Sequence, residues 1–435
     1  MNAPAAVSPD EASGDGSPSE PSAAALAAFD RRWQRVLGCV ALKQADRIPV
    51  AFFQTFWLAK YGGITCREAM YDYEKVAEIA ERACLELDPD LATPVMMTTS
   101  IGRVLDGVGF QQLQWPGHGV DDNRSYQYLD REYMSGEEYD EFLFDPTGFF
   151  LGKYLPRVAT AYDGLQPLAA LATQIYFGVA IGAAAFASPP VQGSLAALGR
   201  AGGISAEFLG AAARLDHRLR CLGFPSGMGG YCTAPYDHVA DYMRGARGMM
   251  TDLYRKPDKL HAVFEKVKTL ALRGAVPQAQ ASGNPLVFIP VHWAPDAFMS
   301  QKQFLQFWWP SFRELLHGLI GAGLIPMVLW EADCTKRLEV IGDIPRGKCI
   351  YWFERTDMVK AFEVLGDVVA LRGNVSAVTL NTGRPEDVDA EVRRLVENVW
   401  NKGGSLILDA ASGIPDEAPI ENVRAMFAAA RKYSG

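Results

Sequence analysis

Short apolar runs alternate with amphipathic helical patterns through the C-terminal half of the chain. The first run, PLVFIPV, covers residues 285–291, and a helical pattern over residues 300–323 follows it. Four more runs, each followed by a helical pattern, cover residues 325–332, 348–354, 367–375 and 405–412. Near-continuous apolar strands separated by amphipathic helices are typical of a parallel sheet covered by helices.

The N-terminal half supplies the remaining strands of such a sheet. Apolar runs at residues 48–57 and 91–97 flank a strong helical pattern over residues 72–87, and a further candidate strand lies at residues 227–235. Eight strand–helix units predict an α/β fold, the (β/α)8 TIM barrel, whose catalytic groups sit at the carboxyl ends of the strands. Residues 110–225 indicate a helical insertion or lid over that face. No GxGxxG or GxxxxGK[ST] motif supports a nucleotide-binding, doubly wound fold instead.

Two segments depart from this alternation. Residues 1–27 contain Ala, Ser, Pro, Gly and acidic residues without aromatic, Lys or Arg side chains, which predicts a disordered tail before one folded domain at 28–435. Residues 164–199 carry no charged side chain and are rich in Ala and Gly. Ala and Gly insert weakly into a bilayer, so we expect a buried or cleft-lining helix pair and no membrane span.

Charge and cysteine content narrow the class of protein. The formal net charge is −9, from 42 basic and 51 acidic residues, which argues against a nucleic-acid or anionic-membrane partner. Seven scattered cysteines form no C-x-x-C pair and fit reduced thiols. We therefore expect a cytoplasmic enzyme with a small-molecule substrate.

Polar residues follow the apolar runs at the predicted carboxyl ends of the strands. Glu331 comes directly after Trp330 with no turn signal between them, and burial there would raise its pKa and suit it to acid–base catalysis. His292 is the one histidine at a predicted strand end, and with Glu331 it is a candidate catalytic residue. The candidate substrate-binding residues are Gln54, Trp57, Trp293, Asp296, Trp330, Asp333, Arg247, Asp409 and Ser412.

Structural roles compete with these assignments. Asp333 could cap the helix that begins near Thr335, and Asp409 could cap a turn. Arg247 lies in a helical stretch, where a solvated face or packing is favoured over binding of a substrate carboxylate. No spacing motif requires a metal ion. The residues that could contribute ligands to one are His292, Glu331, Asp333 and Asp409.

Several segments resemble the uroporphyrinogen decarboxylase-like superfamily, which also holds the cobalamin- and coenzyme-M-type methyltransferases. They read GNPLVFIPVHWAPDAFMSQKQFLQFWWPS, RLEVIGDIPRGKCIYWFERTDM, LGDVVALRGNV and GIPDEAPIENVRAM. FFQTFWLAKYGGITCREAMYD, QWPGHGV and MRGARGMMTDLYRKPDKL resemble the decarboxylase-like, corrinoid-associated branch. The resemblance covers about residues 30–435 and implies a (β/α)8 barrel.

The functional residues of the family are only partly matched in this chain. Authentic uroporphyrinogen decarboxylases hold substrate carboxylates with an Arg-rich loop after the first strand, where residues 54–60 here read QTFWLAK. The zinc methyltransferases of the superfamily place His-x-Cys where this chain has Glu331-Ala332-Asp333, and a third Cys ligand where it has Ser412. The resemblance therefore implies no thiolate-activating zinc, although carboxylates could still hold a harder metal.

We expect a barrel enzyme that transfers a methyl or other one-carbon group from a small apolar or aromatic substrate to a corrinoid or tetrahydrofolate acceptor. A corrinoid protein would be its partner, and superfamily relatives are often homodimers. One alternative is a decarboxylase or lyase of the uroporphyrinogen decarboxylase type, which would release carbon dioxide from substrate alone. Another is a non-catalytic binding protein on the same barrel.

Overall fold

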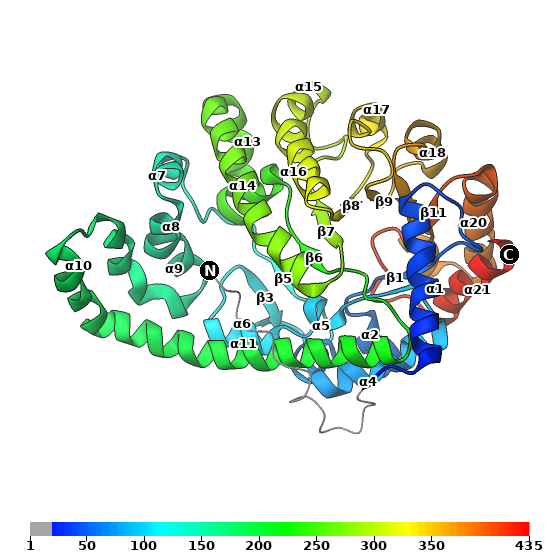
Figure 1. Ribbon diagram of the computed structural model, residues 1–435, viewed down its shortest axis with the longest axis horizontal. Helices are drawn as coiled ribbons and strands as arrows, with labels where there is room; N and C mark the ends of the chain where they lie inside the picture. The colour runs from blue at the N-terminus through cyan, green and yellow to red at the C-terminus, as the bar shows by residue number, and fades with distance from the viewer. Residues whose placement is uncertain (1–19, 435) are drawn as a thin grey trace.

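A six-stranded parallel sheet lies at the centre of the computed structural model, which describes residues 20–434 (Figure 1). All of its neighbouring strands pair in parallel. The five strands predicted in the C-terminal half are confirmed, and the candidate at residues 227–235 supplies the sixth. In spatial order the strands are β11 (Leu406–Ile407), β10 (Ala370–Arg372), β9 (Ile350–Phe353), β8 (Ile325–Trp330), β7 (Leu286–Val291) and β6 (Gly230–Tyr231).

Two further strands form a separate parallel pair. These are β1 (Ala51–Phe52) and β2 (Leu91–Ala92); the predicted second strand is shorter than expected, because a helix occupies Val95–Thr98. An isolated parallel bridge joins Val50 to Leu408, beside β11, and another joins Ala92 to Ser226, just before β6. The pair is thus linked to both edges of the larger sheet. The α/β class is confirmed, while the closed eight-stranded barrel stays a prediction, because the strands belong to separate sheets.

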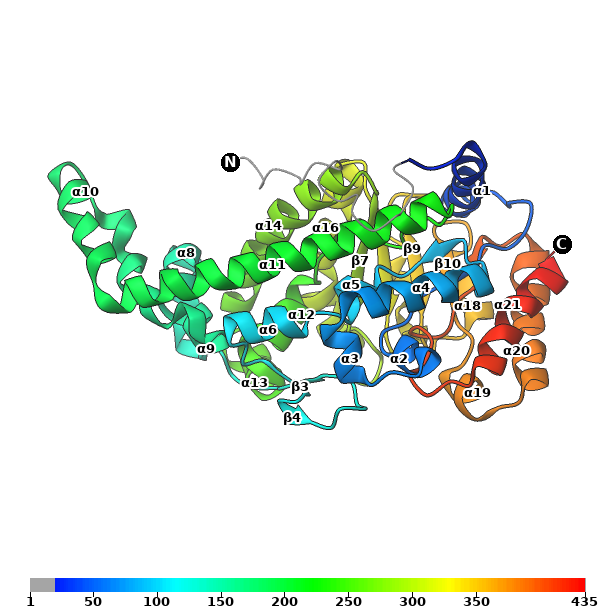
Figure 2. The ribbon, with the colours of Figure 1, turned by 90° about the horizontal axis from the view of Figure 1, so that it is seen from below.

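Helices cover the outside of these strands (Figures 1 and 2). The first begins at Ala23, where the Ser22 hydroxyl accepts a hydrogen bond from Ala25 N, so residues 23–27 of the predicted tail are helical. Residues 1–19 of that tail lie outside the described residues. The helices are α1 (Ala23–Val40), α2 (Trp57–Gly62), α3 (Cys66–Tyr71), α4 (Tyr73–Leu87), α5 (Val95–Thr98), α6 (Gly102–Val108), α12 (Pro235–Val239), η6 (Ala240–Arg244), α13 (Gly245–Arg255), α14 (Pro257–Ser282), α15 (Gln301–Gln303), η7 (Phe304–Trp308), α16 (Trp309–Gly321), η8 (Thr335–Arg337), α17 (Leu338–Ile341), α18 (Met358–Leu365), α19 (Ala377–Thr382), α20 (Pro385–Asn398), η9 (Trp400–Lys402) and α21 (Ile420–Ser434).

The segment predicted as a lid, residues 110–225, lies beside the strands. It starts with a small sheet of order β4-β3-β5 and ends in a helix of 33 residues, α11, that runs along the body. Its elements are β3 (Leu113–Pro116), β4 (Gly119–Val120), β5 (Gln127–Tyr128), η2 (Gly136–Glu138), α7 (Tyr139–Phe144), α8 (Pro146–Phe149), η3 (Phe150–Tyr154), α9 (Leu155–Val158), η4 (Thr160–Thr173), α10 (Phe177–Gly182), η5 (Ala183–Ala187) and α11 (Pro189–Cys221).

Residues 160–188, which we call the arm, extend away from the strands (Figure 2). The arm packs mainly on η3, α9 and α11. Ile175, Tyr176 and Ile181 are 79%, 83% and 74% exposed, so the predicted buried or cleft-lining helix pair is wrong for this part of the chain. Within residues 20–434, no helix is both long and apolar enough to cross a membrane.

Alternation along β8 decides which side chains face the helices. Trp330 packs on Trp308 and Phe312, with ring centroids 5.6 Å and 6.0 Å away, and therefore points outward. Successive side chains of a strand point to opposite faces. Met327 points inward, where Arg372 donates to its sulfur, and Glu331 continues that inward row at the carboxyl end of the strand.

Candidate functional site

His292 follows the last residue of β7 and lies between two carboxylates. Its Nδ1 is 2.7 Å from Oδ2 of Asp241, and its Nε2 is 3.6 Å from Oε1 of Glu331. The side chains of His292 and Glu331 are 35% and 38% exposed. One carboxylate therefore orients the imidazole ring, while the other faces the opposite nitrogen at a position that solvent can reach.

Asp237 and Asp241 come from one helical segment, α12 and the π-helical turn η6. Residues four apart on a helix lie on the same face, so both carboxylates point toward β7. Asp237 accepts hydrogen bonds from His292 N at 2.6 Å and from Trp308 Nε1 at 2.7 Å. The second oxygen of Asp241 accepts from Trp293 Nε1 at 2.6 Å. Asp237 thus fixes the backbone of His292, and Asp241 fixes its ring.

Asp237, Asp241, His292, Glu331 and Glu354 form a cluster of ionisable side chains. The pKa values of Asp237, His292 and Glu331 in this cluster are shifted. Burial lowers the pKa of His292, but the hydrogen bond to Asp241 and the charges of Glu331 and Asp237 outweigh burial and raise it to about 9. Burial raises the pKa of Glu331, with Glu354 adding to the shift and His292 opposing it. Burial and the neighbouring Asp241 raise the pKa of Asp237 to about 7. At neutral pH His292 is therefore an imidazolium that can donate a proton from Nε2.

The backbone turns sharply directly after Glu331. Ala332 has a φ of 52°, a left-handed conformation that costs a non-glycine residue about 1–2 kcal/mol. Its N–H donates to the carboxylate of Glu354, and its carbonyl accepts from Arg355 N at 3.2 Å. Backbone strain of this kind is held only where neighbouring groups enforce it. The turn between β8 and η8 thus keeps Glu331 on the inner side of the sheet.

Two of the three tryptophans predicted to bind substrate lie outside the cluster. Trp57 is buried in α2, donates from Nε1 to Ala418 O at 2.9 Å and stacks on Tyr61. Trp330 is buried between β8 and α16, as described above. Trp293 does lie in the cluster, through its hydrogen bond to Asp241. The aromatic residues of the inner row are instead Phe53, Phe288 and Trp352, which contact one another, and Tyr231, which contacts Phe288.

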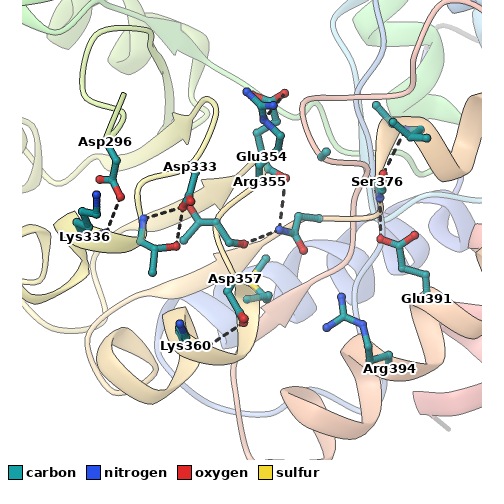
Figure 3. Close-up of a pocket in the computed structure, with 17 residues that line it drawn as sticks. Asp296, Asp333, Lys336, Glu354, Arg355, Asp357, Lys360, Ser376, Glu391 and Arg394 are labelled. Atoms are coloured by element: carbon teal, nitrogen blue, oxygen red, sulfur yellow. Dashed lines mark hydrogen bonds and ion pairs between the residues drawn. The ribbon is translucent and has the colours of Figure 1, made fainter. Parts of the chain in front are cut away.

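Asp333 and Asp296 cap the turn that follows β8. Asp333 Oδ1 accepts from Thr335 N at 2.9 Å, at the first residue of η8, whose N-cap position is occupied by Cys334. Asp296 Oδ2 accepts from Lys336 N at 2.9 Å. Both acids line a pocket of about 810 Å³ along the carboxyl ends of the strands (Figure 3).

Asp409 is committed to an internal ion pair. Its Oδ2 lies 2.6 Å from Nη2 of Arg372, and both side chains are buried. The guanidinium carbon of Arg372 lies 3.9 Å from the ring centroid of Trp352. Burial raises the pKa of Asp409 to about 6, against the opposing charge of Arg372. This pairing, rather than a turn cap or substrate contact, is the role of Asp409 in the structure.

The remaining predicted residues are not drawn into the cluster. Gln54 is buried beside β1, where its backbone N–H donates to Thr93 Oγ1 at 3.1 Å. Arg247 is exposed on α13, as the alternative of a solvated face predicts, and Ser412 is exposed after β11.

The four residues considered as metal ligands do not come together. Within residues 20–434, no group of three or more His, Cys, Asp or Glu side chains could hold a metal ion. Asp333 accepts from the backbone at the start of η8 and Asp409 pairs with Arg372, so of these four residues only His292 and Glu331 are neighbours.

Asp237 and Asp241 are the residues of the cluster that the sequence does not single out. The spacing of Asp237 and Asp241 within PYDHVADYM, just after a candidate strand, is the signal that could have found them. Glu354 follows β9 directly, in the same relation to its strand as Glu331 to β8.

Known proteins resemble the chain in sequence and fold. The family model described as uroporphyrinogen decarboxylase (URO-D) matches residues 163–433. Curated uroporphyrinogen decarboxylases of Methylococcus capsulatus and Coxiella burnetii are 27% and 25% identical to the chain over 228 and 230 residues, which is 51% of this chain in each case. The matches cover 61% and 60% of those proteins, so the chain spans about three fifths of the length of the curated relatives it matches.

A solved structure described as a methyltransferase from Methanosarcina mazei has a similar fold. The TM-score is 0.60, and the alignment covers 92% of this chain and 98% of that chain at 16% sequence identity. At that identity the likeness concerns the fold alone.

Proposed function

The chain belongs to the uroporphyrinogen decarboxylase (URO-D) family, and from that premise we propose that it transfers a methyl or other one-carbon group from a small apolar or aromatic substrate to a corrinoid or tetrahydrofolate acceptor. The observation that carries this proposal is the array Asp241–His292–Glu331 at the carboxyl ends of β7 and β8. Such ends carry the catalytic residues of barrel enzymes, and we take the linked strands as a closed (β/α)8 barrel.

The array fits the removal of a methyl group from an aryl methyl ether. The acceptor is a co-substrate that supplies the electron pair for the new bond to the methyl carbon. As the carbon–oxygen bond breaks, its electron pair stays on the oxygen, and His292 Nε2–H donates a proton to that oxygen. Protonation stabilises the departing aryl oxide and leaves a phenol and a neutral imidazole.

The carboxylates around His292 have separate tasks in this reaction. Asp241 holds Nδ1–H, so Nε2 carries the transferable proton, and the negative charge stabilises the imidazolium before transfer. Glu331 faces Nε2 and is partly exposed, so it can relay a proton from solvent to the imidazole after the phenol leaves. The inner aromatic row with Phe53 and Phe288 supplies an apolar contact for the ring of the substrate.

The cellular setting of the proposal rests on the cysteines. All seven are free thiols in the structure, which suits a reducing cytoplasm. A corrinoid acceptor would be carried by a partner protein, and the chain itself could act as a homodimer.

A carboxy-lyase is the second candidate, because the curated relatives are uroporphyrinogen decarboxylases. In that reaction the carbon–carboxyl bond breaks, carbon dioxide leaves, and the electron pair left on carbon takes the proton of His292. Residues 54–60 lack the arginines that hold the carboxylates of the porphyrinogen, which favours methyl transfer.

The test is a turnover screen of the purified full chain. Methoxylated aromatic compounds are paired with cobalamin or tetrahydrofolate, and uroporphyrinogen is supplied alone, with Glu331→Gln and the exposed Glu363→Gln as matched variants. Methylated acceptor formed by the wild type and by Glu363→Gln, but not by Glu331→Gln, supports methyl transfer. Carbon dioxide released without an acceptor favours the lyase, and an inactive chain favours the non-catalytic binding protein.

A further inference from the structure

The acids that line the pocket beside the cluster are already engaged in hydrogen bonds, whereas its bases are largely unpaired within residues 20–434. It occupies about 810 Å³ and is bordered by the segments that follow β7, β8, β9, β10 and β11, together with α20 (Figure 3). That volume is in the range of small-molecule sites, which is roughly 300–1,000 Å³. Its ionisable lining residues are the acids Asp296, Asp333, Glu354, Asp357 and Glu391 and the bases Lys336, Arg355, Lys360 and Arg394.

Every acid of the pocket already accepts a backbone hydrogen bond. Asp296 and Asp333 cap the turn after β8, and Glu354 holds the N–H of Ala332. Asp357 Oδ1 accepts from Val359 N at 2.9 Å at the start of α18, and Glu391 Oε1 accepts from Ser376 N at 2.9 Å. These carboxylates shape the loops of the pocket, and part of their charge is offset by the peptide dipoles that they bind.

The bases of the pocket are not engaged in this way. Lys336, Lys360 and Arg394 form no ion pair with a carboxylate of residues 20–434, and Figure 3 shows the guanidinium of Arg394 projecting into the pocket. Arg355 reaches Glu354 only at 4.0 Å, and its side chain is 70% exposed. Four cationic side chains with free donors thus border one cavity.

Glu354 connects this cavity to the cluster around His292. It lines the pocket, and its carboxylate accepts a hydrogen bond from the N–H of Ala332, the residue that follows Glu331. A ligand that lies among the bases of α18 and α20 can therefore extend past Glu354 toward Glu331.

We propose that this pocket binds a carboxylate or phosphate group of the co-substrate whose reactive end reaches His292 and Glu331. The inference rests on the proposed function and adds an anionic group to the reactants that it names. Lysine and arginine form charge-assisted hydrogen bonds with both kinds of anion, and arginine binds them in a bidentate manner. Lys360 and Arg394 are the residues that recognise the anionic end.

Equilibrium dialysis of the full chain against labelled pyrophosphate and, separately, labelled propane-1,2,3-tricarboxylate tests the site without turnover. The variant Lys360→Gln/Arg394→Gln removes the two bases, and Lys266→Gln/Arg273→Gln removes one Lys and one Arg from the outer surface of α14. We expect the wild type and the α14 variant to bind at least one anion equally, and the pocket variant to bind it about tenfold or more weakly. The anion that binds more tightly identifies the carboxylate or phosphate source.

The results separate the site from the chemistry. Absence of binding of both anions to the wild type, or equal weakening in both variants, overturns the anion site. Anion binding lost in the pocket variant, together with a turnover screen that yields no methylated acceptor, upholds the site and overturns the proposed function. For an active pair, the pocket variant is expected to raise KM for the anionic co-substrate about tenfold with little change in kcat.

Discussion

Nδ1 of His292 lies 2.7 Å from Oδ2 of Asp241, a residue 51 positions earlier in the chain. The contact joins the carboxyl end of β7 to the π-helical turn that follows α12. It raises the pKa of the imidazole and leaves Nε2 facing Glu331, so it sets both the charge and the direction of the proposed proton donor.

This contact predicts the pH dependence of turnover. Because the imidazolium is the active form and its pKa is about 9, the rate is expected to fall as the pH rises through about 9. Asp241→Asn removes the charged partner and should move this fall toward the ordinary histidine pKa of 6.5. The dependence of the turnover rate on pH, measured for the wild type and Asp241→Asn, tests this expectation. Asp258→Asn, at an exposed position, is the control. An unshifted profile in Asp241→Asn contradicts the role of Asp241.

The same pKa predicts a pH dependence of folding. A histidine whose pKa rises from 6.5 to about 9 on folding contributes stability that is fully present below pH 6.5 and is lost as the pH rises through about 9. His292→Gln lacks this contribution. The difference in unfolding free energy between wild type and variant should therefore shrink across that window in urea titrations. A constant difference would mean that folding does not change the pKa of His292.

Glu331→Gln is expected to lower kcat by roughly a hundredfold or more, because the amide cannot relay a proton from solvent to His292. Thermal unfolding should change little, since Glu331 is partly exposed and glutamine has the same shape. Glu363→Gln on α18 provides the same chemical change on the exposed surface. Equal kcat values for the two variants would sink the assignment of Glu331.

Substitutions of Ala332 test whether the backbone of the turn after β8 is strained. Glycine tolerates its φ of 52°, so Ala332→Gly should leave the unfolding free energy within about 1 kcal/mol of the wild type. Ala332→Val places a β-branched side chain in the left-handed region and should cost about 2 kcal/mol or more. Urea denaturation of both variants measures the two values. Equal stabilities would show that this φ is not maintained in solution.

The ion pair of Arg372 and Asp409 is predicted to be sensitive to the loss of one partner. Asp409→Asn leaves a buried guanidinium without its counter-charge and should cost about 3–5 kcal/mol. Replacing both residues, as in Arg372→Met/Asp409→Leu, should recover much of that loss. The unfolding free energies of the single and double variants give the answer. A double variant as unstable as the sum of the two single variants contradicts the pairing.

The sequence predicts most of the sheet, and it singles out His292 and Glu331, whose side chains the structure brings within 3.6 Å of each other. An apolar run that ends abruptly in Glu331, or in His292, marks the end of a buried strand from the local sequence alone. Trp330 shows the limit of this reasoning. Both faces of a buried parallel strand are apolar, so the sequence alone does not tell which side chains point inward.

Asp241 shows a second limit. Its partner lies on another element, and only the path of the chain from β6 through α12 to β7 brings the two side chains together. Asp409 shows a third, because a carboxylate at a strand end can serve a buried arginine as well as a substrate. In both cases tertiary contact, rather than local pattern, determines the role.

The arm and the strand-bearing core are expected to differ in the free energy of local unfolding. The apolar tip of the arm around Tyr176 is open to water, and most of the arm's packing is against α11 and the short helices next to it, not against β7 or β8. Segments with few buried contacts open at a lower free energy than the core that carries them. The amide hydrogens of the arm will therefore exchange with solvent through local openings that leave the contacts among His292, Asp241 and Glu331 intact.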